Sequence, residues 1–181
     1  MGIEICMQSY GRYIMGSLNI GKEEAVRWIQ ENFKKGETCL DVGACNGKWY
    51  DLIGDYLIMD AVEIWMPNIQ RYELSKKYRM VICSDILQFN YIYYDLIIFG
   101  DVLEHMSVSE AQKVIEYARP RCRDMLIAIP FMYEQGIKNG NPYEIHVQDD
   151  LTPELFEQRY PGFKPIFMSD NYAYYVKNNN I

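Results

Sequence analysis

Helix-like and strand-like patterns of apolar residues alternate along this chain from Lys22 onward. Over residues 20–35, apolar residues recur every three or four positions, as on one face of an amphipathic helix, and Gly36 ends that pattern. In residues 95–99, Asp95 is instead followed by a continuous apolar run, which is typical of a central parallel strand buried on both faces. This alternation predicts an α/β fold built from βαβ units.

Capping and turn residues define the remaining elements. Ser107 and Glu110 have the spacing of a capping box, which predicts a helix that starts there and ends before Pro120. The last two strands are joined by a short turn, so we expect them to be antiparallel. In chain order, the patterns predict helices at 20–35, 47–56, from Pro67 onward, 107–119 and 152–160, and strands at 38–42, 58–64, 79–83, 95–99, 125–129, 164–168 and 172–177.

Length and composition favour one domain, because 181 residues with 49% apolar or aromatic side chains can bury a single core. The net charge of −7 argues against a broad nucleic-acid-binding surface. Residues 1–10 contain Glu4 and no extended apolar core, so they resemble neither a signal peptide nor a membrane anchor, and we expect a cytoplasmic protein without a membrane partner. Five cysteines without a C-x-x-C pair suit a reducing compartment.

One short segment indicates a ligand site. The sequence LDVGACNG at Leu40–Gly47 ends an apolar strand in an acid and a turn with two glycines, which let a ligand approach the main chain closely. Ligands of open α/β sheets bind at the carboxyl ends of the strands. Glu63 ends the second predicted strand and Asp85 follows the third, where acids can accept hydrogen bonds from ribose hydroxyls and an adenine amino group. We therefore predict a nucleotide-like ligand.

Two common nucleotide-binding motifs do not fit this turn. The dinucleotide fingerprint G-x-G-x-x-G would need glycines at positions occupied by Cys45 and Lys48. A P-loop would need four residues between its glycines and a Ser or Thr after the lysine, whereas three residues separate Gly43 from Gly47 and Trp49 follows Lys48. An oxidoreductase that uses an adenine nucleotide is therefore a less favoured alternative.

The glycine loop, Glu63, Ser84-Asp85 and residues 95–106 resemble the successive motifs of class I S-adenosylmethionine-dependent methyltransferases, and the resemblance covers residues 20–131. It implies a Rossmann-like, seven-stranded, mostly parallel sheet with helices on both faces and an antiparallel last strand. In that family the loop packs against the methionine part of S-adenosylmethionine, and the two acids bind its ribose and adenine. By position, the implied cofactor-binding residues are Asp41, Gly43, Ala44, Gly47, Glu63, Ile64, Trp65, Asp85, Ile86 and Gly100.

Two features qualify the resemblance. The family usually has glycine where Cys45 stands, and a side chain there narrows the loop, so a noncatalytic partner that keeps the fold is an alternative. The stretch DVLEHM at Asp101–Met106 resembles one common among members that methylate small molecules. This likeness places Gly100 and Asp101 beside the reactive methyl group. Trp65 fits a ribose or adenine contact and simple core packing equally well.

Methyl transfer from a sulfonium needs no metal ion, and we expect none, but a general base helps a hydroxyl or protonated amine to react. The candidate catalytic residues are Asp101 and the chain's two histidines, His105 and His146, although a structural or solvated role suits each histidine as well. His146 lies in residues 131–150, a long loop that we interpret as a substrate lid. Residues 1–19 would form an N-terminal cap segment, in which Tyr10 and Tyr13 are placed to close over the cofactor.

The sequence thus predicts a single-domain methyltransferase that moves a methyl group from S-adenosylmethionine to an oxygen or nitrogen of a small molecule. A noncatalytic cofactor-binding module and an enzyme that methylates a macromolecule are the alternatives. The sequence fits a monomer and an oligomer equally well.

Overall fold

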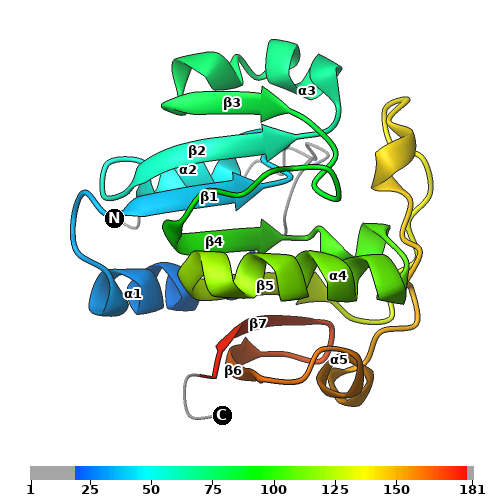
Figure 1. Ribbon diagram of the computed structural model, residues 1–181. Helices are drawn as coiled ribbons and strands as arrows, with labels where there is room; N and C mark the ends of the chain where they lie inside the picture. Colours follow the sequence, from blue (N-terminus) through cyan, green and yellow to red (C-terminus); the bar gives the residue numbers. More distant parts are fainter. Residues whose placement is uncertain (1–18, 179–181) are drawn as a thin grey trace, which may run out of the picture.

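Seven strands form one sheet in the order β3-β2-β1-β4-β5-β7-β6 in the computed structural model, which describes residues 19–178 (Figure 1). The first five strands are parallel to one another, and β7 runs antiparallel between β5 and β6. This arrangement confirms the predicted fold class. The strands are β1 (Thr38–Val42), β2 (Ile58–Glu63), β3 (Met80–Cys83), β4 (Tyr94–Gly100), β5 (Cys122–Pro130), β6 (Phe163–Met168) and β7 (Tyr172–Lys177).

Helices cover both faces of the sheet. Helices α1 (Lys22–Asn32) and α2 (Lys48–Ile53) pack on one face, and α4 (Val108–Ala118) and α5 (Pro153–Arg159) pack on the other. The short helix α3 (Met66–Arg71) follows β2. Four 3₁₀ turns complete the described elements: η1 (Leu74–Lys76), η2 (Leu103–His105), η3 (Arg119–Arg121) and η4 (Pro142–Glu144).

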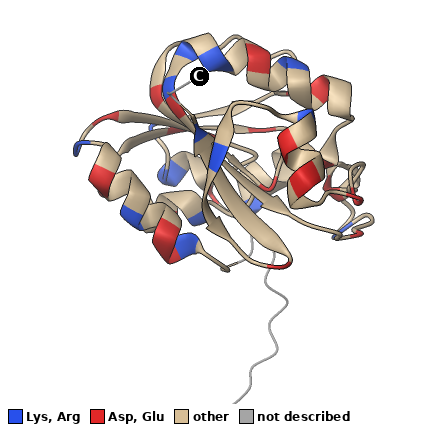
Figure 2. Ribbon diagram, turned by 90° about the horizontal axis from the view of Figure 1, so that it is seen from below, with Lys and Arg blue, Asp and Glu red and all other residues tan. Residues whose placement is uncertain are grey.

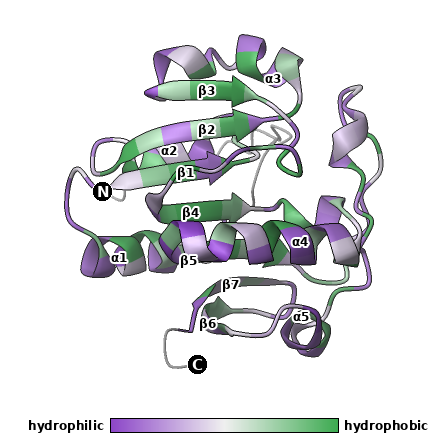
Figure 3. Ribbon diagram, viewed as in Figure 1, coloured by the Kyte–Doolittle hydropathy of each residue, from purple (hydrophilic) through white to green (hydrophobic). Residues whose placement is uncertain are grey.

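Strand β4 shows why the sheet divides the core into two layers. Its side chains alternate, so that Ile97 and Phe99 join the cluster under α4 and α5, while Leu96 and Ile98 join the cluster under α1 and α2. All four side chains are fully buried, and Figure 3 shows the strand as hydrophobic along most of its length. Burial on both faces fixes the position of the loop that leaves its carboxyl end.

Most predicted elements are confirmed, with shifts at their ends. The capping box is present: the Ser107 side chain accepts a hydrogen bond from the Glu110 backbone N–H, and the Glu110 carboxylate accepts one from the Ser107 backbone N–H. Strand β5 begins at Cys122, three residues before the predicted start, because Arg123 lies in the strand and pairs with the Glu37 carboxylate at 2.7 Å. A prediction that relies on apolar residues alone leaves such a charged position out of the strand.

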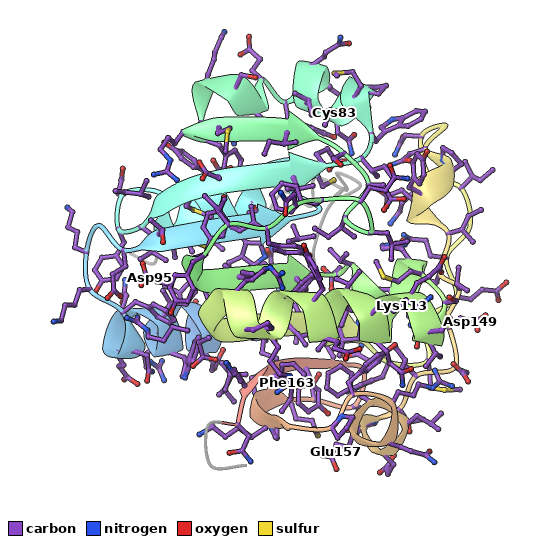
Figure 4. The ribbon with its side chains drawn as sticks, in the orientation of Figure 1. Cys83, Asp95, Lys113, Asp149, Glu157 and Phe163 are labelled. Carbon is purple, nitrogen blue, oxygen red and sulfur yellow. The ribbon has the colours of Figure 1, made fainter. Side chains whose placement is uncertain are left out.

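The two ends of the parallel strands differ in role. At the amino ends, the Asp95 carboxylate at the start of β4 accepts hydrogen bonds from the backbone N–H and hydroxyl of Thr38, each at 2.8 Å, and so joins β4 to β1. Figure 4 labels Asp95 at this end and Asp149 on the opposite side. The carboxyl ends face residues 131–150, which form the separate yellow arm of Figure 1. Any ligand site of this fold is expected at the carboxyl ends.

Positively and negatively charged residues are mixed along the helices (Figure 2). None of the helices within residues 19–178 combines the length and the apolar character needed to cross a membrane. All four cysteines in this part of the chain are free, and Cys39 and Cys122 are buried.

Candidate functional site

A cavity of about 460 Å³ lies at the carboxyl ends of the parallel strands. Its walls include the loops that follow β1, β2, β3 and β4, together with part of residues 131–150. The strand order reverses between β1 and β4, and the cavity lies at this reversal, where open α/β sheets bind their ligands. Its volume is within the range of small-molecule sites.

The glycine loop after β1 forms one wall of the cavity. Gly43 has a φ of 68°, and a Cβ atom there would lie 2.7 Å from the side chain of Val102, so this position requires glycine. The Gly43 N–H donates to the Val62 carbonyl at 2.8 Å, which ties the loop to β2. Ala44 and Cys45 line the cavity next to it, and Cys45 has a φ of 46° that side chains rarely adopt.

Glu63 is held by backbone groups on two sides. One of its carboxylate oxygens accepts the Cys45 N–H and the other accepts the Trp65 N–H, each at 2.8 Å. The side chain is buried, and this burial raises the pKa of the Glu63 carboxyl. The Asn68 side chain also hydrogen-bonds this carboxylate. Since a carboxylate can accept about four hydrogen bonds, some acceptor capacity remains for the hydroxyl groups of a ligand.

The loop after β3 forms the neighbouring wall. Asp85 accepts a hydrogen bond from the Leu87 N–H at 2.9 Å, which fixes its side chain at the start of a turn. The buried Ile86 lines the cavity beside it, and Ile64 lines the cavity from the end of β2. An acid beside two apolar side chains suits a flat ring that carries an amino group.

At the end of β4, the backbone approaches the floor of the site closely. A Cβ atom on Gly100 would lie 2.3 Å from the indole nitrogen of Trp49, so only glycine fits there. Asp101 follows with a φ of 58°, and one oxygen of its carboxylate accepts a hydrogen bond from the Tyr172 hydroxyl at 2.5 Å. Its other oxygen is buried and has no hydrogen-bond partner among residues 19–178.

The two histidines come together at the cavity wall. The His105 and His146 rings pack edge to face with centroids 4.7 Å apart. His105 Nδ1 lies 3.2 Å from the Ile145 carbonyl, and His146 Nδ1 lies 2.7 Å from the Tyr133 carbonyl. Burial lowers the pKa of both imidazoles, which favours the neutral form.

Residues 131–150 are fastened to η2, the turn that carries His105. The Glu104 carbonyl accepts the N–H groups of Val147 at 2.7 Å and Gln148 at 3.0 Å. The Gln148 side chain also donates to the carbonyls of Leu103 and Met106 at 2.8 and 3.0 Å. The arm therefore covers the cavity from a fixed base, while its movement as a lid stays a prediction.

Three predicted cofactor residues do not line this cavity. Asp41 is buried and accepts a hydrogen bond from the Tyr78 hydroxyl at 2.5 Å. Gly47 precedes α2 with a φ of 77°, and Trp65 packs against Tyr143 with ring centroids 6.0 Å apart. They support the loops that line the cavity. Tyr10, Tyr13 and nearly all of the predicted N-terminal cap segment lie outside the described residues.

The cavity is acidic, because six carboxylates line it against two lysines. Glu104 was not among the predicted site residues, although it lies in the DVLEHM stretch and is fully buried at the cavity wall. The signal that could have identified Glu104 is its position between an apolar residue and a histidine in this stretch. The acids are Glu63, Asp85, Asp101, Glu104, Glu110 and Glu144, and the lysines are Lys48 and Lys138.

Solved structures similar to this one include three methyltransferases. A S-adenosylmethionine-dependent methyltransferase from Clostridium acetobutylicum has a TM-score of 0.65 and 12% identity, covering 86% of this chain and 89% of that one. The N-methyltransferase NodS from Bradyrhizobium japonicum has a TM-score of 0.60 and 11% identity, with 88% and 96% covered.

A 1,6-didemethyltoxoflavin-N1-methyltransferase from Burkholderia thailandensis, solved with 1,6-didemethyltoxoflavin and S-adenosylhomocysteine bound, has a TM-score of 0.60 and 15% identity, with 87% and 77% covered. No protein-family model and no curated protein sequence matches the chain. These likenesses show that the chain has the fold of class I methyltransferases, as the sequence motifs implied.

Proposed function

We propose that the chain is a methyltransferase that binds S-adenosylmethionine and transfers its methyl group to an oxygen or nitrogen of a small molecule. The observation that carries this proposal is Glu63, a buried acid held in place by two backbone N–H groups at the edge of a cavity in a methyltransferase fold. Such a fixed acceptor pair suits the two neighbouring hydroxyl groups of a ribose.

The neighbouring walls fit the other parts of the same molecule. The backbone at Gly43 and Ala44 offers a close approach for the methionine part, and Asp85 beside Ile86 suits the amino group and the ring of adenine. When bound, S-adenosylmethionine supplies a methyl group on a positively charged sulfur. An excess of carboxylates around the cavity favours such a cation and disfavours a phosphate-bearing ligand.

The chain's own residues would then position the acceptor and remove its proton. Gly100 and Asp101 lie at the end of β4 and line the cavity, and the absence of a side chain on Gly100 lets the Trp49 indole pack directly against the backbone there. His105 and His146 line the same cavity with neutral imidazoles, and each has a ring nitrogen free to take a proton. Alignment and exclusion of water supply most of the acceleration in this kind of transfer.

The acidic, partly covered cavity favours a small acceptor over nucleic acid. A cofactor-binding module without catalysis is the second candidate, and the specific observation behind it is Cys45, which puts a side chain into the loop at a backbone conformation that favours glycine. Transfer of a methyl group distinguishes the methyltransferase from the noncatalytic module.

The test is to incubate the protein with methyl-labelled S-adenosylmethionine and a small-molecule extract and to follow the label. We expect transfer to a small molecule by the wild type and by Asp149→Ala, a change at an exposed acid away from the cavity, and little transfer by Glu63→Ala. Binding of S-adenosylhomocysteine without transfer to any acceptor would favour the module. Failure to bind it would contradict both candidates.

A further inference from the structure

Three atoms that accept hydrogen bonds converge on one point of the cavity wall. His105 Nε2 lies 4.0 Å and His146 Nε2 lies 3.9 Å from the same carboxylate oxygen, Oε1 of Glu104. One ligand atom from each of the three residues lies within 4.8 Å of the other two. The residues come from η2 and from the arm at 131–150, two segments that are distant in sequence.

The hydrogen bonds of the imidazoles fix which nitrogen carries the proton. A backbone carbonyl can only accept, so Nδ1 of His105 must donate to Ile145 and Nδ1 of His146 must donate to Tyr133. In a neutral imidazole the other nitrogen then has a bare lone pair. Each Nε2 atom therefore offers a lone pair about 4 Å from the same carboxylate oxygen.

The Glu104 carboxylate lacks a partner at the centre of this cluster. Its side chain is 0% exposed, and neither oxygen has a hydrogen-bond partner within residues 19–178. An unpaired buried carboxylate is costly, and the nearby Asp101 carboxylate adds repulsion. What the site lacks is a positive charge.

The cluster is held firmly enough to act as a binding site. The N–H groups of Val147 and Gln148 bind the Glu104 carbonyl, which places His146 directly against η2. Each imidazole is oriented by the hydrogen bond from its Nδ1, as is usual for histidines that bind metals. Two imidazole nitrogens and one carboxylate are also a common ligand set for divalent first-row transition metals.

From this geometry we infer that Glu104, His105 and His146 bind a divalent transition-metal ion in the wall of the cavity. Ligand atoms about 2.0–2.2 Å from an ion lie roughly 3.0–3.6 Å apart, so side-chain movements of about 1 Å or less would complete the site. The remaining coordination positions would be open to the cavity. If the proposed function holds, on which this last step alone depends, such an ion favours an acceptor that presents an oxygen atom to it, and the two Nε2 atoms then serve as metal ligands in place of general bases.

The experiment is calorimetric titration of Mn²⁺, Co²⁺ and Zn²⁺ into the full-length protein after treatment with a chelator. We expect one ion per chain, and absorption bands of protein-bound Co²⁺ in the visible range. Glu104→Gln and His146→Asn should each weaken binding by about 100-fold or more, because each removes one of three ligands. Asp149→Asn is the matched control, since it neutralises an exposed carboxylate of the same arm that does not line the cavity, and it should alter affinity less than about threefold.

The absence of saturable binding by the wild type, or binding that survives in both ligand variants, would overturn the inference. Circular dichroism and thermal unfolding of each variant show whether it is folded, and Glu104→Gln keeps the shape of the side chain. Titration of S-adenosylhomocysteine into the same samples separates this inference from the proposed function. Cofactor binding without metal binding contradicts only the metal site, and the reverse contradicts only the proposed cofactor.

Discussion

The carboxylates on the two sides of the cavity differ in their hydrogen-bond partners. On the side formed by the ends of β2 and β3, Glu63 accepts two backbone N–H groups and Asp85 accepts one. On the side formed by the end of β4, Asp101 has one buried oxygen without a partner within residues 19–178, and Glu104 has two. The first side is completed by the protein's own backbone, whereas the second side needs a ligand to complete it. Under the proposed function, the cofactor would bind on the first side and the reacting partner on the second.

The largest expected effect is a loss of cofactor affinity, and only substitutions on the side formed by the ends of β2 and β3 should cause it. Glu63→Ala removes the acceptor for two backbone N–H groups and for the proposed ribose hydroxyls, and should weaken S-adenosylhomocysteine binding by about 100-fold, or ~2.7 kcal/mol. Glu104→Gln, on the other side, should change this affinity less than about threefold. Calorimetry at one salt concentration measures both. Equal losses in the two variants would contradict the division into two sides.

The second prediction is that replacing a glutamate with glutamine has opposite effects on stability on the two sides of the cavity. In metal-free protein at pH 8, Glu104→Gln should raise the free energy of unfolding by about 1–2 kcal/mol, because it removes an unpaired buried charge. Glu63→Gln should lower it by about 1–2 kcal/mol, because it replaces an oxygen that accepts a backbone N–H with an amide group that cannot.

Urea unfolding measures both values. Since burial raises the pKa of Glu104, the carboxyl of the folded protein is protonated at little cost at low pH, and the gain from Glu104→Gln should shrink as the pH falls from 8 to 5. A change of the same sign in both variants would contradict the contrast between the two sides.

Asp41 tests whether the contrast extends below the cavity wall. One of its oxygens accepts the Tyr78 hydroxyl, and the other has no partner in the described part of the chain. Burial raises the pKa of Asp41 to about 7, against the opposing effects of Tyr78 and the nearby Lys22. The folded chain thus keeps a proton that the unfolded chain loses near pH 4, and this contribution to stability disappears as the pH rises through about 7.

Wild-type stability relative to Asp41→Asn should therefore fall by about 1 kcal/mol or more between pH 4 and pH 8. Glu37 is a control of opposite sign: the hydrogen bond from Arg123 lowers the pKa of its carboxyl to about 2, so its contribution is lost only as the pH falls below about 4. Urea unfolding between about pH 2 and pH 8 measures both. A constant difference between wild type and Asp41→Asn would remove Asp41 as the titrating group.

The smallest effect is expected at Cys45, on the cofactor side. Cys45→Gly should stabilise the fold by a few tenths of a kcal/mol, up to about 1, because glycine adopts its φ of 46° without strain. It should also leave S-adenosylhomocysteine affinity unchanged or strengthen it by a few-fold. Glu73→Gly is the matched control, since Glu73 has a φ of 49° outside the cavity, and it should affect stability alone. Weaker cofactor binding by Cys45→Gly would show that the thiol side chain is a contact.

The sequence predicted the fold well because its signals are local. Continuous apolar runs and the capping box at Ser107 each report on a few neighbouring residues, and the strands and α4 follow them closely. The short 3₁₀ turns escaped prediction because three residues are too few to show a period. The charged start of β5 at Arg123 escaped it because pairing with Glu37 across 86 residues stabilises a position that looks polar.

The site was predicted in part for the same reason. Glycine positions and acids at strand ends are visible in the sequence, and most of them line the cavity. The meeting of His146 with Glu104 and His105 depends on backbone hydrogen bonds between segments about 40 residues apart, which no local pattern shows. That both Glu104 oxygens lack partners is a property of packing, and only the three-dimensional arrangement reveals it.

A crystal structure of the protein with S-adenosylhomocysteine tests the central claim most directly. We predict that the ribose hydroxyls lie about 3 Å from the Glu63 carboxylate, with the adenine beside Asp85 and the sulfur directed toward Gly100. A nucleoside bound elsewhere, or a cavity without it at saturating concentration, would contradict the assignment of the two sides.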